Sequence, residues 1–265
     1  MLSLAVASSA GLASRAEVAV LLDDQGDPII LYGFARDGSG WRTVDSVTNA
    51  PTRWTRCLDG RAIGEVDDGR EDGSTLGRSA FAGGRSWGLE SGERIHRPLV
   101  LSSLGHCKDP DRWKRQSLPA PVLAQLREAF EQQSQLAGKP KAGASDGSSQ
   151  CGEKPVRHEP GAVKVIASYG SGGGSWLATL SMGALYRGDG IVPCNYQRLT
   201  FLLSSPRSLV KFLGYNLTLI DAGDYGGTGE SALVFFEEST EDPLDSIVFF
   251  WNAGAEQVSV RWRGN

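Results

Sequence analysis

The feature that most constrains this chain lies near its C-terminus, in residues 217–262. Four segments rich in branched and aromatic side chains follow one another there, separated by turns and loops in which Asp and Gly recur. Residues 233–236 and 247–251 are continuously apolar, which is typical of strands covered on both faces. Residues 257–262 alternate apolar and polar side chains and predict a strand with one face in water. The stretch therefore predicts a meander of strands inside a β domain.

The same rhythm of apolar segments and Asp/Gly turns recurs near the other end of the chain, in residues 17–44. Two such units predict repeated β-meanders of the kind found in propeller blades, and we expect the two ends of the chain to lie close together. The 265 residues include 34 glycines and seven tryptophans, as is typical of many short strands joined by tight turns. We expect one mainly antiparallel, all-β domain over residues 17–265, with a β-propeller-like or related layered β-meander architecture.

Three segments depart from this pattern. Residues 119–137 place Leu126 and Phe130 on one helical face, and they predict an amphipathic helix that packs on the β body. Residues 138–161 are rich in Lys, Gly, Ser and Pro and predict a flexible loop. Residues 59–77 are rich in Asp, Arg and Gly and predict an exposed loop.

The first turn of the C-terminal stretch has a recognisable motif. It reads Asp221-Ala-Gly-Asp-Tyr-Gly-Gly-Thr-Gly-Glu-Ser-Ala-Leu-Val-Phe-Phe236. This resembles the FG-GAP (VCBS-type) repeat of β-propellers, G-D-x-D-G-D-G-x-x-D followed by an apolar strand. Gly223, Asp224 and Gly229 match the frame of that repeat. The resemblance covers a single repeat, mainly residues 217–236, and it implies a propeller whose Asp-rich turn commonly holds Ca²⁺.

The metal positions of the motif are mostly not acidic in this chain. Gly226 and Thr228 stand where the family has its second and third acids, and Ala232 stands where the repeat closes with an acid. Calcium takes several oxygen ligands, carboxylates among them. Only Asp221 and Asp224 remain, so we interpret the turn as structural, with weak Ca²⁺ binding by these two residues as the alternative. No other cofactor is indicated.

The net charge of the chain argues against one class of partner, and its hydropathy argues against a membrane-spanning helix. The formal net charge of −4 argues against nucleic acid, because phosphate binding needs a basic surface. No segment has the run of about 18 apolar residues that a membrane-spanning helix needs.

The N-terminus and the cysteines indicate export. Residues 1–16 resemble the end of a secretory signal peptide, and the alternative is a disordered tail. Four cysteines allow two disulfides, with buried free thiols as the alternative. We favour Cys151–Cys194, which flank a block of strands, and Cys57–Cys107 then follows by elimination. The hypothesis is a periplasmic or secreted protein.

The sequence identifies no catalytic residue. Gly84-Arg-Ser86-Trp-Gly88 matches the G-x-S-x-G nucleophile motif, but it lacks the strand before it and the helix after it that the motif needs. His96, His106 and His158 form no metal-binding pair, and nothing pairs one of them with Ser86.

Two functions remain. The first is a non-catalytic exported binding or scaffold module, whose loops contact a carbohydrate or protein ligand through Trp and Tyr. The second is a hydrolase acting on a polysaccharide or ester, which would need two carboxylates facing one cleft.

Overall fold

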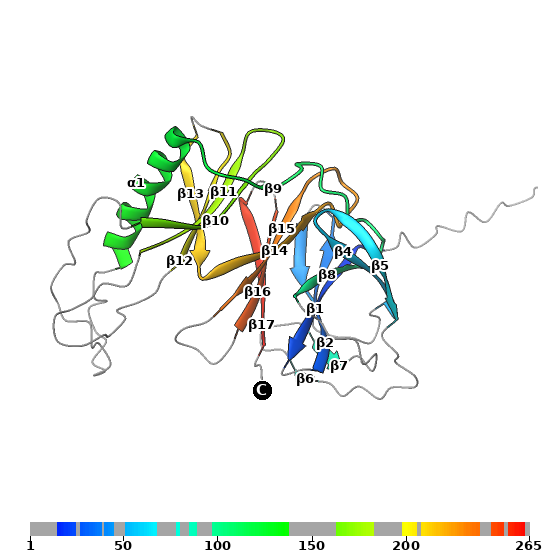
Figure 1. Cartoon of the computed structure of the whole chain (residues 1–265). Helices are drawn as coiled ribbons and strands as arrows, with labels where there is room; N and C mark the ends of the chain where they lie inside the picture. Colours follow the sequence, from blue (N-terminus) through cyan, green and yellow to red (C-terminus); the bar gives the residue numbers. More distant parts are fainter. Residues whose placement is uncertain are drawn as a thin grey trace, which may run out of the picture.

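The computed structural model shows three antiparallel β-sheets and one described helix, stacked in layers (Figure 1). The predicted fold class, a mainly antiparallel layered β-meander with one amphipathic helix, is confirmed. The structure describes residues 15–24, 27–38, 40–44, 51–67, 78–79, 85–88, 97–137, 163–182, 198–205, 208–238, 245–251 and 254–262.

The first layer is an eight-stranded sheet from the N-terminal part of the chain. Its strand order is β5-β4-β8-β1-β2-β7-β6, and β3 pairs with the C-terminal part of β2. Along β1, Val18 and Val20 face the middle sheet, whereas Leu21 packs in a separate cluster on the opposite face. Because successive side chains of a strand point to opposite faces, β1 supplies side chains to two cores. The strands are β1 (Glu17–Asp24), β2 (Asp27–Asp37), β3 (Gly40–Thr43), β4 (Arg53–Leu58), β5 (Arg61–Asp67), β6 (Arg78–Ser79), β7 (Arg85–Gly88) and β8 (Leu99–Ser102).

The middle layer is a four-stranded meander in the order β14-β15-β16-β17. Val234 and Phe249 pack toward the first sheet. Their neighbours Leu233 and Phe250 pack toward the third sheet. The prediction that the two continuous apolar runs are covered on both faces is therefore confirmed. The strands are β14 (Leu217–Gly223), β15 (Ala232–Glu237), β16 (Asp245–Trp251) and β17 (Glu256–Trp262).

The third layer is a five-stranded sheet in the order β13-β12-β11-β10-β9, and helix α1 covers its outer face (Figure 1). Phe130 of the helix packs on Phe201 of the sheet with ring centroids 6.5 Å apart. Val122 and Leu126 join the same core, so the predicted apolar stripe is the buried one. The elements are β9 (Lys114–Arg115), α1 (Ala120–Ala137), β10 (Val163–Gly170), β11 (Trp176–Met182), β12 (Arg198–Leu203) and β13 (Val210–Tyr215).

The N-terminal and C-terminal parts of the chain touch where the first sheet meets the middle sheet. A Cβ atom on Gly33 would lie 2.4 Å from the Cγ2 of Val260, so β2 and β17 approach closely only because residue 33 is a glycine. Among the described strands β17 pairs only with β16. The contact is therefore made by packing of one sheet on the other.

The loop predicted over residues 59–77 is wrong in its first part. Residues 61–67 form β5, which pairs with β4 in an antiparallel hairpin. Asp59 and Gly60 form the turn with φ values of 49° and 69°, the left-handed pair that a two-residue hairpin turn requires. The Asp-Gly pair is a strong hairpin signal, but the polar composition around it led us to predict a loop.

Several predicted segments lie outside the described residues. They are residues 1–14 of the signal-peptide prediction and residues 138–161 of the flexible-loop prediction. Among the described residues, no helix has both the length and the apolar character needed to cross a membrane.

Candidate functional site

A loop between β8 and α1 crosses the ends of the middle and third sheets, and Asp109 organises it. One oxygen of this carboxylate accepts hydrogen bonds from the Asp111 backbone N–H at 3.0 Å and from the Ser231 hydroxyl at 2.6 Å. The other oxygen accepts from the Trp113 backbone N–H at 2.5 Å. Short Asp side chains favour such local bonds to the backbone that follows them. Asp109 therefore fixes the positions of Asp111 and Trp113.

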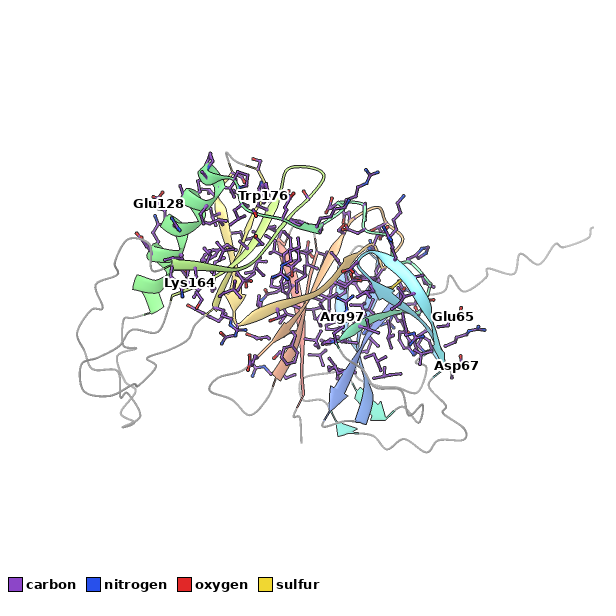
Figure 2. All side chains as sticks on the ribbon, in the orientation of Figure 1. Glu65, Asp67, Arg97, Glu128, Lys164 and Trp176 are labelled. Carbon is purple, nitrogen blue, oxygen red and sulfur yellow. A yellow bond between two sulfur atoms is a disulfide. The ribbon has the colours of Figure 1, made fainter. Side chains whose placement is uncertain are left out.

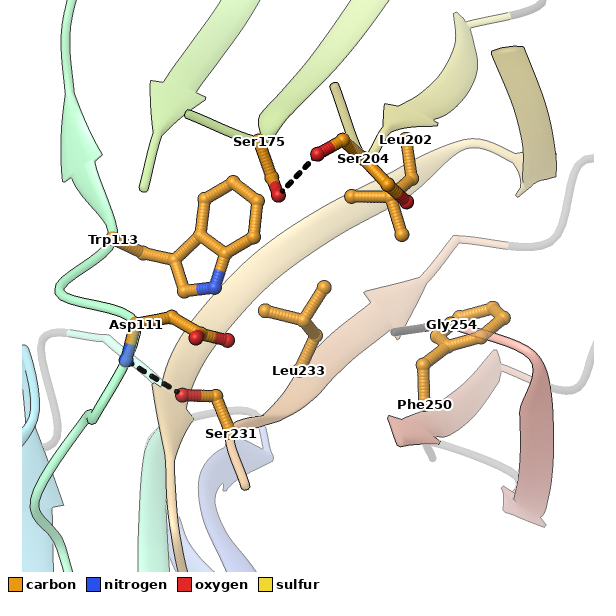
Figure 3. Close-up of a pocket in the computed structure, with 9 residues that line it drawn as sticks. All are labelled: Asp111, Trp113, Ser175, Leu202, Ser204, Ser231, Leu233, Phe250 and Gly254. Atoms are coloured by element: carbon orange, nitrogen blue, oxygen red, sulfur yellow. Dashed lines mark hydrogen bonds between the residues drawn. The ribbon is translucent and has the colours of Figure 1, made fainter. Parts of the chain in front are cut away.

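Asp111 and Trp113 form the rim of a small cavity of about 40 Å³ between the middle and third sheets (Figure 3). Apolar side chains from both sheets form part of its wall, and serines stand around its rim. The Ser175 hydroxyl donates to the Ser204 carbonyl at 2.9 Å, and the Ser231 hydroxyl accepts from the Asp111 N–H at 3.2 Å. The lining residues are Asp111, Trp113, Ser175, Leu202, Ser204, Ser231, Leu233, Phe250 and Gly254.

The indole N–H of Trp113 is buried and has no hydrogen-bond acceptor among the described residues. Figure 3 shows this nitrogen on the side of the ring that faces Asp111 and Leu233. A buried donor without a partner is costly, and such a group in a native structure calls for an acceptor from water or a ligand. The cavity thus combines an unused donor with the carboxylate of Asp111, which is an acceptor.

Asp221, one of the two candidate metal ligands, lies on β14 and is only 3% exposed. Its carboxylate accepts from the Tyr225 hydroxyl at 2.9 Å and from the Gly60 N–H at 3.3 Å. Burial raises the pKa of Asp221 to about 6, although the hydrogen bonds from Tyr225, Ala222 and Gly60 act in the opposite direction. Burial likewise raises the pKa of Tyr225. Asp221 therefore joins the middle sheet to the turn of the β4–β5 hairpin.

Asp224, the other candidate ligand, closes its own turn. One oxygen accepts from the Thr228 N–H at 2.8 Å, and the other accepts from the Gly229 N–H at 2.6 Å. Asp221 and Asp224 thus belong to separate hydrogen-bond networks. No group of three or more His, Cys, Asp or Glu side chains that could hold a metal occurs among the described residues. Weak Ca²⁺ binding at this turn stays a prediction.

The predicted disulfide Cys57–Cys107 is present, with the two Cα atoms 5.3 Å apart. It ties β4 to the loop that carries Asp109, and both cysteines are buried in the core between the first and middle sheets. The preferred pair, Cys151–Cys194, lies outside the described residues.

The residues of the G-x-S-x-G motif lie in a strand. Ser86 is in β7 and pairs with Leu31 of β2, whereas a nucleophile elbow stands between a strand and a helix. His106 is exposed beside Gly227, and His96 and His158 lie outside the described residues.

The sequence analysis predicted neither this cavity nor a role for Asp109, Asp111 or Trp113. The available signal was Asp109-Pro110, which favours a turn that bonds to its own backbone. Comparison with protein-family models, with curated proteins and with solved structures finds no match to this chain.

Proposed function

We propose that the protein is a non-catalytic, exported binding module, and that its ligand contacts the cavity end of the stacked sheets. The observation that carries this proposal is the unused indole N–H of Trp113 beside the Asp111 carboxylate, in a cavity with an apolar wall. Ligand sites combine an apolar lining with a few polar groups that fix orientation. Here the middle and third sheets supply the apolar lining, and the loop held by Asp109 supplies the polar groups of Asp111 and Trp113.

The acids at this cavity favour binding over hydrolysis. Asp111 is the single carboxylate that lines it among the described residues. Asp109 lies behind the rim, but both of its oxygens accept hydrogen bonds that hold the loop. Hydrolysis by paired carboxylates needs two acids about 5–10 Å apart and facing the same bond. These residues are therefore better suited to holding a ligand than to cleaving it.

The turn at Asp224 supports kinship with FG-GAP/VCBS propellers as part of the same proposal. The sheet that contains it is a four-stranded antiparallel meander, which is the composition of a propeller blade. Its neighbours stack on both of its faces. The buried disulfide supports the proposed periplasmic or secreted location, because such bonds persist in oxidising compartments.

The test is a binding screen on the full chain. Neutral oligosaccharides and short peptides are titrated by calorimetry into the wild type, into the Trp113→Phe/Asp111→Asn double variant and into Trp176→Phe. Trp176 begins β11 and packs in the core beneath α1, so its variant is a matched control outside the cavity. We expect at least one ligand class to bind the wild type and the control but not the double variant. Release of new reducing ends or of cleaved product by the wild type would favour the hydrolase instead.

A further inference from the structure

The cavity offers a donor and an acceptor close together. Trp113 provides an N–H that no described residue accepts, and Asp111 provides carboxylate oxygens on the same rim. A hydroxyl group satisfies both, because its oxygen accepts one hydrogen bond and its hydrogen donates another. A carbonyl or carboxylate would satisfy the indole alone and would face the charge of Asp111.

The charges around the cavity also favour a neutral group. An anion would meet the carboxylate of Asp111. The two negative charges would repel each other. A cationic ammonium or guanidinium group has donors only, so it would leave the Trp113 N–H without an acceptor. The ligand group that fits both sides of the rim therefore carries no net charge.

The volume limits how much of a ligand can enter. A water needs about 10–15 Å³ of such space, so a cavity of about 40 Å³ admits roughly three or four non-hydrogen atoms. A whole sugar ring would remain at the mouth. Leu233 and Phe250 line the apolar wall of the cavity. The C–H groups of a carbon that carries a hydroxyl can contact this wall.

We propose that the cavity binds the hydroxymethyl group of a neutral sugar, whose ring lies at the mouth beside Trp113. The oxygen accepts from the Trp113 N–H, the hydroxyl donates to Asp111, and the CH₂ group contacts Leu233 and Phe250. This inference rests on the proposed function and names the ligand class of that site.

Two ligands that differ by this group alone provide the test. Methyl β-D-glucopyranoside has the hydroxymethyl group, and methyl β-D-xylopyranoside lacks it. Each is titrated into full-length, ¹⁵N-labelled protein while the indole N–H signals are followed by NMR, with the Trp113 signal assigned from Trp113→Phe. We expect the glucoside to shift the Trp113 signal in a saturable way and the xyloside to bind at least about tenfold more weakly, because it lacks one hydrogen bond and one buried CH₂ group.

Variants separate recognition from general loss of structure. Trp113→Phe keeps a ring but removes the donor, and Asp111→Ala removes the acceptor, which is part of an exposed side chain. Both should lose the preference for glucoside over xyloside, whereas Trp176→Phe should keep it. If Trp113→Phe melts at a much lower temperature than Trp176→Phe, the Asp111→Ala result decides.

Each remaining outcome counts against the inference. Equal binding of the two glycosides, or a preference that survives in both variants, would overturn it. If neither glycoside binds but a peptide in the screen does so at the cavity, the inference fails and the binding function stands. If no ligand in the screen binds and only water occupies the cavity, both proposals fail.

Discussion

The middle sheet and the β4–β5 hairpin are both antiparallel, but they are stabilised in different ways. The middle sheet is covered on both faces, and Phe249 at its centre is fully buried between Phe34, Trp41 and Tyr225. Six of the seven residues of β5 are exposed, and Figure 2 shows Glu65 and Asp67 at the outer edge of the molecule. Within the hairpin, β4 pairs with β8 and buries Trp54, whereas β5 has little buried surface of its own.

Three individual links add to the β4–β8 pairing in holding the hairpin. Cys57 of β4 is bonded to Cys107, Gly60 in the turn donates to Asp221, and Asp59 lies 3.6 Å from Arg97. The ion pair is exposed and contributes little, as is usual for surface pairs. Of the three links, the disulfide and the hydrogen bond to the buried carboxylate are therefore the stronger ones. Where a strand cannot bury apolar surface, a few specific bonds take over the stabilising role.

The largest expected effect tests burial in the middle sheet. Phe249→Ala should lower the free energy of unfolding by about 3–5 kcal/mol, because it removes a fully buried ring and leaves a cavity. Ile63→Ala on β5 should cost less than about 1 kcal/mol, since Ile63 is 45% exposed. Urea denaturation of both variants measures the difference. Equal losses of unfolding free energy in the two variants would contradict the conclusion that β5 depends less on burial than the middle sheet does.

The next effect tests the cross-link. The Cys57→Ala/Cys107→Ala double variant should lose about 2–4 kcal/mol of unfolding free energy, because the bond closes a segment with a sequence separation of 50 residues. Hydrogen exchange should then rise in β4 and β5 before it rises in β15 and β16. The wild type in reductant should behave like the double variant, because its disulfide is also broken. Equal exchange rates in all four strands would contradict a stabilising role of the disulfide that is confined to the hairpin.

The third prediction concerns pH and the link between the two regions. The pKa of Asp221 is raised from 3.8 to about 6, so the folded protein holds this proton more tightly than the unfolded chain. The contribution of this group to stability is therefore full below about pH 4 and is lost as the pH rises through 6. The loss amounts to about 2–3 kcal/mol.

Urea denaturation between pH 4 and 7 measures this dependence. Burial also raises the pKa of Glu237, which contributes in the same direction, so the comparison with Asp221→Asn isolates the Asp221 part. The variant should show a flatter pH profile than the wild type. Parallel profiles would remove Asp221 as the cause.

A smaller effect is expected at the turn of the middle sheet. Asp224→Ala removes both acceptors for the Thr228 and Gly229 N–H groups and should cost about 1 kcal/mol. Asp224→Asn retains one oxygen and should lose less. A thermal melt of the two variants beside the wild type measures the difference. A cost above that of the disulfide variant would show that this turn, rather than burial, governs the middle sheet.

The smallest expected effect is that of calcium. Both oxygens of Asp224 accept from its own turn, and those of Asp221 accept from Tyr225 and Gly60. Adding millimolar CaCl₂, or removing divalent ions with EDTA, should leave the melting temperature of the wild type unchanged. A gain of several degrees that disappears in Asp224→Ala would instead reveal a cation site.

The sequence predicted the parts of the fold that repeat locally. The stripe with Leu126 and Phe130 predicted the helix, and the continuous apolar runs predicted the doubly covered strands β15 and β16. Composition misled the prediction at β5, because an edge strand with six of its seven residues exposed has the polar character of a loop. The Asp59-Gly60 turn was the better signal there.

The cavity could not be predicted in the same way. Trp113, Ser175 and Ser231 come from separate parts of the chain, and they meet only because the third sheet stacks on the middle one. The raised pKa of Asp221 has the same origin, since it depends on burial that no local pattern reveals. Neither the cavity nor the raised pKa of Asp221 can be inferred from the spacing of residues along the chain.

The glycine at position 33 has a consequence for the order of assembly. The side chain of Val260 fills the space beside Gly33, and the core between the first and middle sheets joins residues from 16 to 107 with residues from 225 to 260. During synthesis, the inner face of the N-terminal sheet must wait for the final strands to leave the ribosome. Until then that apolar surface has no partner from the same chain, so it is open to non-native contacts.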